Sequence, residues 1–524
     1  MLKQPASIFN DVIGPVMRGA SSSHVAASVR IGRLARQMIK GNIVEVIVEF
    51  NKEGSLATTY HGHGSDIGLV AGLLNYDTDD ERLSESLSNA NDKGINISFH
   101  VVDYVASHPN TYKMKIISDI GEVIHTKSIS TGGGMIEFED IQGYDVSIEG
   151  GYFETLIFLR KADHCVEDIL SSNKVLIEDI NFTLKSTGVL INIKSTEKID
   201  DHIIEMIKLN NEITDIISLA PVLPIMSYKK CNLPFRSSKE MLEVNKFQNK
   251  SLWELAVDYE SIRGNISKDD VLKKMKDIVE MMYSGIIKGL NGTDYQDRIL
   301  HRQSHKIKEA QEMNLLVPGN VMNRMISYIT ALMEIKSSMG VFVAAPTAGS
   351  CGGLPGTILS VVDEMDLSVE TAAKALLAAG IIGVFIAEHA TFAAEVGGCQ
   401  AECGAGSSMA AAGLVELMGG SATKAVDAAS MALQNVLGLI CDPVADRVEA
   451  PCLGKNILAG SNALSCANMA LAGFDKVIPF DETVETMLKV GKMMVPELRC
   501  TGKGGLSITD TAKEIYINLN KNNS

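Results

Sequence analysis

The pattern of hydrophobic and polar positions divides the chain into three regions that differ in predicted secondary structure. Residues 1–148 mix helix and strand patterns. The β-branched run within residues 41–51 predicts a strand, and residues 112–130 predict two strands that turn at Asp119-Ile120-Gly121. We therefore expect an α+β domain over residues 1–148.

Residues 149–228 predict a second, compact domain. Its order of elements is βαββαβ, the ferredoxin-like pattern, and the sequence places strands at 152–160, 175–185, 188–193 and 213–219 and helices at 165–170 and 199–207. The region resembles an ACT domain, a small fold that often binds amino-acid effectors. Its first strand runs into Lys161-Ala162-Asp163-His164 rather than into a Pro-Gly turn, so a structural or dimerising role stands beside a regulatory one.

Residues 229–524 predict an all-α domain. Apolar side chains recur there at helical spacing, for example at Val271, Met275, Ile278, Val279, Met282 and Ile286. The longest apolar stretch, residues 372–387, contains Lys374. Because a bilayer span needs about 20 apolar residues, we expect a buried core helix and no membrane partner.

The net charge of the chain argues against two classes of binding partner. Against 64 acidic residues stand 48 basic ones, which gives a net charge of −16. The chain also lacks a long Lys/Arg block, so the sequence argues against nucleic acid and against an anionic membrane. No targeting segment is evident at the start of the sequence, and we expect a cytoplasmic protein.

The cysteines suggest the chemistry. Nine cysteines among 524 residues are too few for a disulfide scaffold, and no pair has the CxxC spacing of a zinc ribbon. Three are expected to be small core residues: Cys351, Cys403 and Cys466. Three others lie close to Gly or Pro, where helices are expected to end: Cys399, Cys441 and Cys452. Thiolates on loops that converge at one point are what a metal cluster requires.

Several motifs together resemble the iron–sulfur-dependent L-serine dehydratases, in the single-chain form with fused beta-type and alpha-type regions. The resemblance covers most of the chain. It rests on the three cysteine segments and on residues 345–350 and 408–414, on Leu498-Arg499 and Gly504-Gly505-Leu506, and on Asp11-Val12-Ile13-Gly14-Pro15, Ser21-Ser22-Ser23-His24 and Gly62-His63-Gly64-Ser65-Asp66.

The resemblance implies an oxygen-sensitive lyase of amino-acid catabolism and gluconeogenesis that converts L-serine to pyruvate and ammonia by β-elimination. It implies a 4Fe–4S cluster held by Cys399, Cys441 and Cys452, and a homodimer. Three thiolates leave one iron open as a Lewis acid, whereas four would saturate the cluster. No lysine context resembles a pyridoxal-phosphate site, so we expect no pyridoxal phosphate.

The same resemblance implies the remaining site residues. His63 is the first candidate for the general base, and His61, which stands where the family usually shows lysine, is the second. The segment of Ser21, Ser22, Ser23 and His24 is expected to contact the substrate, although it can also cap the following helix. Further substrate contacts are expected from Asp66, Thr347 and Ser350.

Cys500 lies in a Gly-rich segment, where the family more often shows an acidic residue. Three roles are open for its thiol. It can be inert, it can line the substrate pocket, or it can serve as a fourth ligand that caps the open iron until substrate displaces it.

Two other functions compete with serine deamination. Ala20 and Val25 stand where the family has proline and threonine, which leaves room for an L-cysteine desulfidase or for a lyase of another β-substituted amino acid. A non-catalytic amino-acid sensor, built on the ACT-like region with a structural metal, is the alternative from a different class.

Overall fold

The computed structural model describes residues 4–14, 16–18, 22–161, 165–209, 212–228, 231–295 and 297–522. The chain forms two compact units. Unit 1 comprises Met1–Ala20 and Cys231–Ser524, and unit 2 comprises Ser21–Lys230. The domain boundary expected at residue 148 falls inside unit 2 and stays a prediction.

Unit 2 contains a six-stranded sheet of order β3-β2-β4-β5-β6-β7. Strands β2 and β3 are parallel, and the other neighbours are antiparallel. The strand expected within residues 41–51 and the hairpin expected within 112–130 are confirmed. The strands are β2 (Ile43–Asn51), β3 (Asn96–Val102), β4 (Thr111–Ser118), β5 (Val123–Gly132), β6 (Met135–Ile141) and β7 (Tyr144–Ile148).

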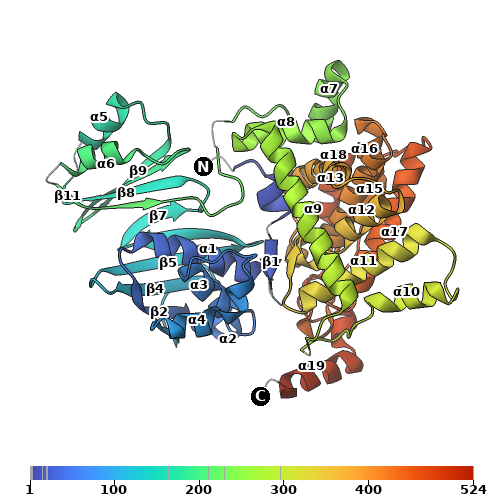
Figure 1. Cartoon of the computed structure of the whole chain (residues 1–524), viewed down its shortest axis with the longest axis horizontal. Coiled ribbons are helices and arrows are strands. Elements are labelled where there is room, and N and C mark those ends of the chain that lie inside the picture. The colour runs from blue at the N-terminus through green and yellow to red at the C-terminus, as the bar shows by residue number, and fades with distance from the viewer. Residues whose placement is uncertain are drawn as a thin grey trace. The chain divides into compact units, whose positions relative to one another are not determined.

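Helices cover one face of this sheet (Figure 1). Helix α1 packs closely against α3, where a Cβ on Gly72 would lie 2.1 Å from the carbonyl oxygen of Val29, so a side chain at residue 72 would separate the two helices. The helical elements here are α1 (Ser22–Met38), α2 (Leu56–Thr59), α3 (Ser65–Leu73), η2 (Glu81–Glu85) and α4 (Ser86–Asp92).

A second sheet of unit 2 has four antiparallel strands in the order β11-β8-β10-β9. The elements are β8 (Phe153–Leu159), α5 (Cys165–Ser172), β9 (Ile177–Lys185), β10 (Gly188–Ser195), α6 (Asp201–Lys208) and β11 (Ile213–Leu219). The expected βαββαβ order is therefore confirmed. Residues 162–164 of the segment after the first strand, Ala162-Asp163-His164, lie outside the described residues.

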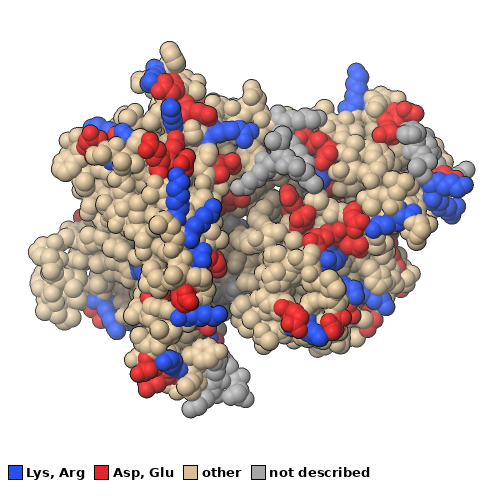
Figure 2. Space-filling model, turned by 180° about the vertical axis from the view of Figure 1, so that it is seen from behind, with Lys and Arg blue, Asp and Glu red and all other residues tan. Residues whose placement is uncertain are grey.

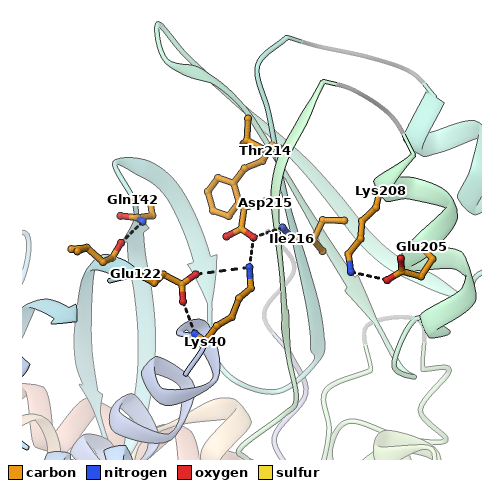
Figure 3. A network of polar contacts seen from close by, with 10 residues as sticks. Lys40, Glu122, Gln142, Glu205, Lys208, Thr214, Asp215 and Ile216 are labelled. Atoms are coloured by element: carbon orange, nitrogen blue, oxygen red, sulfur yellow. Dashed lines mark hydrogen bonds and ion pairs between the residues drawn. The ribbon is translucent and has the colours of Figure 1, made fainter. Parts of the chain in front are cut away.

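The end of helix α1 is tied to both sheets of unit 2 (Figure 3). The Lys40 ammonium lies 2.6 Å from a carboxylate oxygen of Asp215 in β11, and the Lys40 backbone N–H donates to Glu122 beside β5. The side chain of Gln37 exchanges two hydrogen bonds with the backbone of Ala220. The helix that begins with Ser22 is thus fixed at its far end by contacts to both sheets.

Unit 1 is helical in the region from residue 238 onward, as expected, with one short exception. Strand β1 (Val16–Arg18) pairs antiparallel with β12 (Val341–Val343). The longer helices are α7 (Ser238–Gln248), α8 (Leu252–Gly264), α9 (Lys268–Asn291), α10 (Ser304–Glu312), α11 (Asn320–Ser337), α12 (Gly353–Glu364), α13 (Val369–His389), α15 (Ala405–Leu417), α16 (Ala422–Gln434), α17 (Cys452–Leu471), α18 (Phe480–Met493) and α19 (Asp510–Asn522). The short ones are η3 (Ala348–Ser350), α14 (Ala394–Gly397), η4 (Gln400–Gly404), η5 (Val444–Asp446), η6 (Pro496–Leu498) and η7 (Gly505–Ile508).

The first residues of the chain belong to this helical unit, although the sequence assigns them to the first domain. Segment η1 (Ile8–Val12) packs on α13, where a Cβ on Gly380 would meet the side chain of Ile8 at 2.7 Å. The buried carboxylate of Glu260 accepts hydrogen bonds from the Ser7 hydroxyl and the Ile8 N–H. Apolar periodicity does not reveal against which domain such a segment packs.

Helix α13 lies in the middle of the bundle (Figure 1). It is long and apolar enough to cross a membrane by length and composition, but 78% of its most hydrophobic window is buried inside the protein. The expected core helix over residues 372–387 is confirmed. Acidic and basic side chains are interspersed over the face of the described residues shown in Figure 2.

Candidate functional site

Five thiols gather in unit 1. Three of them, Cys399, Cys403 and Cys441, share one buried cluster, against which Cys500 packs. The thiols of Cys399 and Cys403 are hydrogen-bonded to each other, as are those of Cys441 and Cys500. The fifth, Cys452, is also buried and close enough to Cys399 for the charge of one thiol to affect the other.

The thiols come from four separate segments. Cys399 lies between α14 and η4 and Cys403 belongs to η4, whereas Cys452 is the first residue of α17. Cys441 lies in the loop after α16 and forms a β-bridge with Arg499, so its N–H donates to the carbonyl of Leu498 at 2.9 Å. Cys500 follows η6, and its N–H donates to the carbonyl of Cys441 at 3.0 Å. The three cysteines expected as ligands and Cys500 are therefore brought together.

Three of these thiols, Cys403, Cys441 and Cys452, are held in the protonated form. The hydrogen bond with Cys500, followed by burial, raises the pKa of Cys441, and burial raises the pKa of Cys452 to about 12. The hydrogen bond with Cys399, followed by burial, raises the pKa of Cys403. Thiols that are so reluctant to ionise become thiolates when a cation displaces their protons.

No group of three or more His, Cys, Asp or Glu among the described residues is spaced to hold a single metal ion. A single zinc ion needs its donors in one tetrahedral shell. A cluster of several irons instead binds each cysteine at a different iron, so its ligands lie farther apart than the donors of one ion.

Two lysines lie beside the thiols. Lys455 of α17 donates to the Ile440 carbonyl at 2.8 Å and to a carboxylate oxygen of Asp442 at 2.6 Å, on either side of Cys441. Lys336 is buried, its ammonium donates to the Val448 carbonyl at 2.8 Å, and burial lowers its pKa. The Lys455 ammonium offsets negative charge on the thiolates of a loaded site, and the charge of such thiolates opposes the effect of burial on the pKa of Lys336.

Thr347 and Ser350, both expected to contact substrate, lie next to the thiol cluster. The Thr347 hydroxyl is 3.2 Å from that of Ser350 and donates to a carboxylate oxygen of Glu402 at 2.6 Å. Burial raises the pKa of Glu402 to about 7, although the bond from Thr347 opposes this shift. In the sequence, Glu402 and Cys403 follow the expected ligand Cys399 and precede the next one, Cys441.

Asn456 joins this loop to the thiols. Its amide nitrogen donates to the carbonyls of Gly349 and Cys452 at 2.8 and 2.9 Å, and contacts the Cys403 sulfur at 3.8 Å. Its amide oxygen accepts from the N–H groups of Gly352 and Gly353. The side chain is fully buried, and it fixes the start of α17 against the segment that follows Thr347.

A second cluster of candidate residues lies in unit 2. His24, on the first turn of α1, and His63, in the turn before α3, have ring centroids 4.5 Å apart. Burial, and then the charge of His63, lowers the pKa of His24 to about 4. Burial also lowers the pKa of His63. Both rings are therefore neutral at neutral pH, and a neutral imidazole can accept a proton.

The other candidates of unit 2 surround this pair. The His61 ring is exposed and its Nδ1 lies 2.6 Å from a carboxylate oxygen of the buried Asp66. The His63 Nδ1 is buried and has no hydrogen-bond partner among the described residues. Ser22 is buried and Ser23 is half-buried at the start of α1, whereas Ser21, with the N-cap expected there, lies outside the described residues.

Sequence reasoning did not identify Glu402, Lys336, Lys455 or Asn456, and it treated Cys403 as an ordinary core residue. One signal for Glu402 was present, because it is a single acidic residue between Gly397 and Gly413 in a stretch of small and apolar residues. The other residues carry no local signal, since tertiary packing alone brings them to the thiols.

Comparisons with known proteins extend over both units. Residues 247–507 match the family model of the serine dehydratase alpha chain. The chain is 36% identical over 281 residues to the probable L-serine dehydratase alpha chain of Bacillus subtilis, covering 54% of this chain and 94% of that one. The chain belongs to the serine dehydratase family.

Two further relatives show the organisation of this family member. The probable L-serine dehydratase beta chain of Bacillus subtilis is 39% identical over 211 residues, covering 39% of this chain and 94% of that one. L-serine dehydratase 2 of Escherichia coli is 26% identical over 532 residues, covering 96% of this chain and 97% of that one. The serine dehydratase described here is thus the single-chain form with fused beta and alpha regions.

Proposed function

We propose that this chain deaminates L-serine to pyruvate and ammonia by β-elimination at a 4Fe–4S cluster held by Cys399, Cys441 and Cys452. The observation that supports this proposal most strongly is the gathering of these thiols, from segments far apart in the sequence, inside the region that matches the serine dehydratase alpha chain. We further propose a cytoplasmic, oxygen-sensitive homodimer without pyridoxal phosphate.

The donor set fits an iron–sulfur cluster. Thiolates are the usual ligands of such clusters, and the three proposed ligands are buried from water at 2%, 4% and 7% relative exposure for Cys399, Cys441 and Cys452. When it is bound, a cluster with three protein ligands supplies an open iron that acts as a Lewis acid toward the substrate. Lys336 and Lys455 add positive charge next to the thiolates.

The residues of unit 2 supply the proton chemistry in this proposal. Removal of the Cα proton needs a base that is neutral at working pH and within reach of its proton. His63 meets the first condition because burial lowers its pKa, and its buried Nδ1 has no partner among the described residues. His61 is the second candidate, but its ring pairs with Asp66.

Hydroxyl groups and a helix end are proposed to hold the substrate. Ser22 is the first described residue of the 17-residue helix α1, whose N-terminal N–H groups attract a carboxylate. Ser21, Ser23, His24 and Asp66 are proposed to contact substrate around this end. In unit 1 the same role is proposed for Thr347 and Ser350.

The four-stranded sheet of unit 2 and its two helices are proposed to form an ACT-like region with a structural or dimerising role. Sedimentation of the full chain tests the dimer. A second variant carries charged residues in place of Phe182 and Leu184, the exposed apolar side chains of β9. If this variant is still a dimer, β9 does not form the dimer interface.

Turnover of purified protein tests the proposed reaction. The full chain is purified and reconstituted without oxygen, and pyruvate and ammonia are measured with L-serine, L-threonine and L-cysteine. We expect equal amounts of the two products and the highest kcat/KM with L-serine. A preference for L-cysteine with release of sulfide would make the chain a desulfidase, and binding without turnover would make it a sensor.

A further inference from the structure

The C-terminal segment that carries Cys500 lies along the loop of residues 441–443. Cys441 exchanges two backbone hydrogen bonds with this segment, one with Leu498 and one with Cys500. The Ser507 hydroxyl donates to the Pro443 carbonyl at 2.8 Å. At the residue between Cys441 and Pro443, Oδ2 of Asp442 accepts a hydrogen bond from the Leu506 N–H at 3.0 Å. Each residue of the loop therefore accepts a hydrogen bond from one segment.

Asp442 is the one side chain among these acceptors, and both of its oxygens are engaged. While Oδ2 accepts from Leu506, Oδ1 accepts from Lys455 at 2.6 Å. The ion pair is largely shielded from water, with side-chain exposures of 13% for Lys455 and 6% for Asp442. A Cβ on Gly505 would lie 2.6 Å from the Asp442 Cβ, so the segment approaches as closely as glycine permits.

Lys455 carries the connection to a third segment. It lies on α17 three residues after Cys452, and it donates to the carbonyl of Ile440 as well as to Asp442. Its ammonium thus joins the helix that begins at Cys452 to the loop that contains Cys441.

We propose that Asp442 is a positioning residue that couples the three thiol-bearing segments, so that a single carboxylate sets where Cys441, Cys452 and Cys500 stand relative to one another. The positioning role rests on the proposed function only in that Cys441 and Cys452 are taken as cluster ligands. Loss of the Asp442 carboxylate removes one of the four hydrogen bonds that hold the Cys500 segment, together with the ion pair to Lys455. The segment and the Cys441 loop are then held less firmly, whereas loss of the Lys455 ammonium loosens the loop but leaves the bond to Leu506.

The experiment measures how fast Cys500 reacts with a maleimide in the metal-free full chain, with the modified peptide quantified by mass spectrometry. A hydrogen bond to a charged group contributes enough free energy that its loss gives about a tenfold change. We expect Asp442→Ala to speed labelling of Cys500 about tenfold and Asp442→Asn to speed it less, because an amide keeps one acceptor. Lys455→Met should speed labelling less than Asp442→Ala.

Lys476→Met is the matched control, because it breaks an ion pair with Asp427 in the same unit that touches none of these segments. Iron bound after anaerobic reconstitution is the second readout, and it should fall in both Asp442→Ala and Lys455→Met but not in the control. Labelling of Cys500 within twofold of the unaltered protein in both Asp442 variants, or equal acceleration in the control, would overturn the proposal. A chain that binds no iron would refute the ligand assignment and leave the labelling result intact.

Discussion

The rings of His24 and His63 lie with their centroids 4.5 Å apart and their planes inclined by 42°. His24 comes from the first turn of α1 and His63 from the turn before α3, and the close packing of these two helices brings the rings together. Two imidazoles at this distance disfavour protonation of each other, which adds to the effect of burial on His24.

His63→Gln tests the proposed base. We expect kcat for L-serine to fall about 10²–10⁴-fold, the usual contribution of general-base assistance, while the iron content is unchanged. His61→Gln is the matched comparison, because His61 is 78% exposed, and it should lower kcat much less. The reverse order of the two variants would assign the base to His61.

The His24 ring should make the stability of the chain depend on pH. Its folded-state pKa of about 4 lies below the ordinary 6.5, so between these values the unfolded chain binds a proton that the folded one does not. The free energy of unfolding therefore falls as pH decreases from about 6.5 to 4, by about 3 kcal/mol from this group. His24→Gln should reduce the slope of stability against pH in denaturant titrations. An unchanged slope would contradict the burial assigned to this ring.

Much of the fold could be predicted from the sequence, because strand and helix periods are local properties. The β-branched run that forms β2, the hairpin of β4 and β5, and the βαββαβ order of the second sheet all follow from such patterns. The packing of residues 4–14 on the helical unit could not be predicted, because apolar side chains such as Ile8 and Val12 can be buried against either unit.

The candidate site shows the same division. Cys399, Cys441 and Cys452 stand out in the sequence because each lies within two residues of Gly or Pro, in a segment that resembles the family. Cys403 also precedes a glycine, Gly404, but it lies only four residues after Cys399, and the sequence does not show that the two thiols interact. Asn456 lies on a helix that carries other polar residues, and the sequence around it does not indicate that its side chain is buried.

Asn456→Ala tests the link between α17 and the segment after Thr347. It leaves the N–H groups of Gly352 and Gly353 without their acceptor, and unsatisfied buried groups cost about 1–3 kcal/mol each. We expect the free energy of unfolding to fall by about 3 kcal/mol. Asn468→Ala, at an exposed position of the same helix, should change it by less than about 0.5 kcal/mol. Equal effects in the two variants would refute the role of Asn456.

Cys500→Ser distinguishes the roles of the fourth thiol. Because Cys500 contacts Cys441 but is not one of the three proposed ligands, we expect the iron content to be retained. The KM for L-serine or the half-life of activity in air should change if the thiol lines the pocket or caps the iron. Unchanged values of both would make Cys500 inert, and loss of the iron would make it a required ligand.

Cys399, Cys441 and Cys452 are proposed to hold an iron–sulfur cluster that the reaction requires. The most direct test measures iron and acid-labile sulfide per chain after anaerobic reconstitution of the three Cys→Ser variants, together with pyruvate formed from L-serine. Cys466→Ser is the matched control, because among the described residues this buried thiol forms hydrogen bonds with Asn435 and Asn462 alone, and a hydroxyl can make the same bonds. We predict that the control keeps iron, sulfide and activity and that each of the three variants loses all of them together. Full activity without iron in any of the three would contradict the claim.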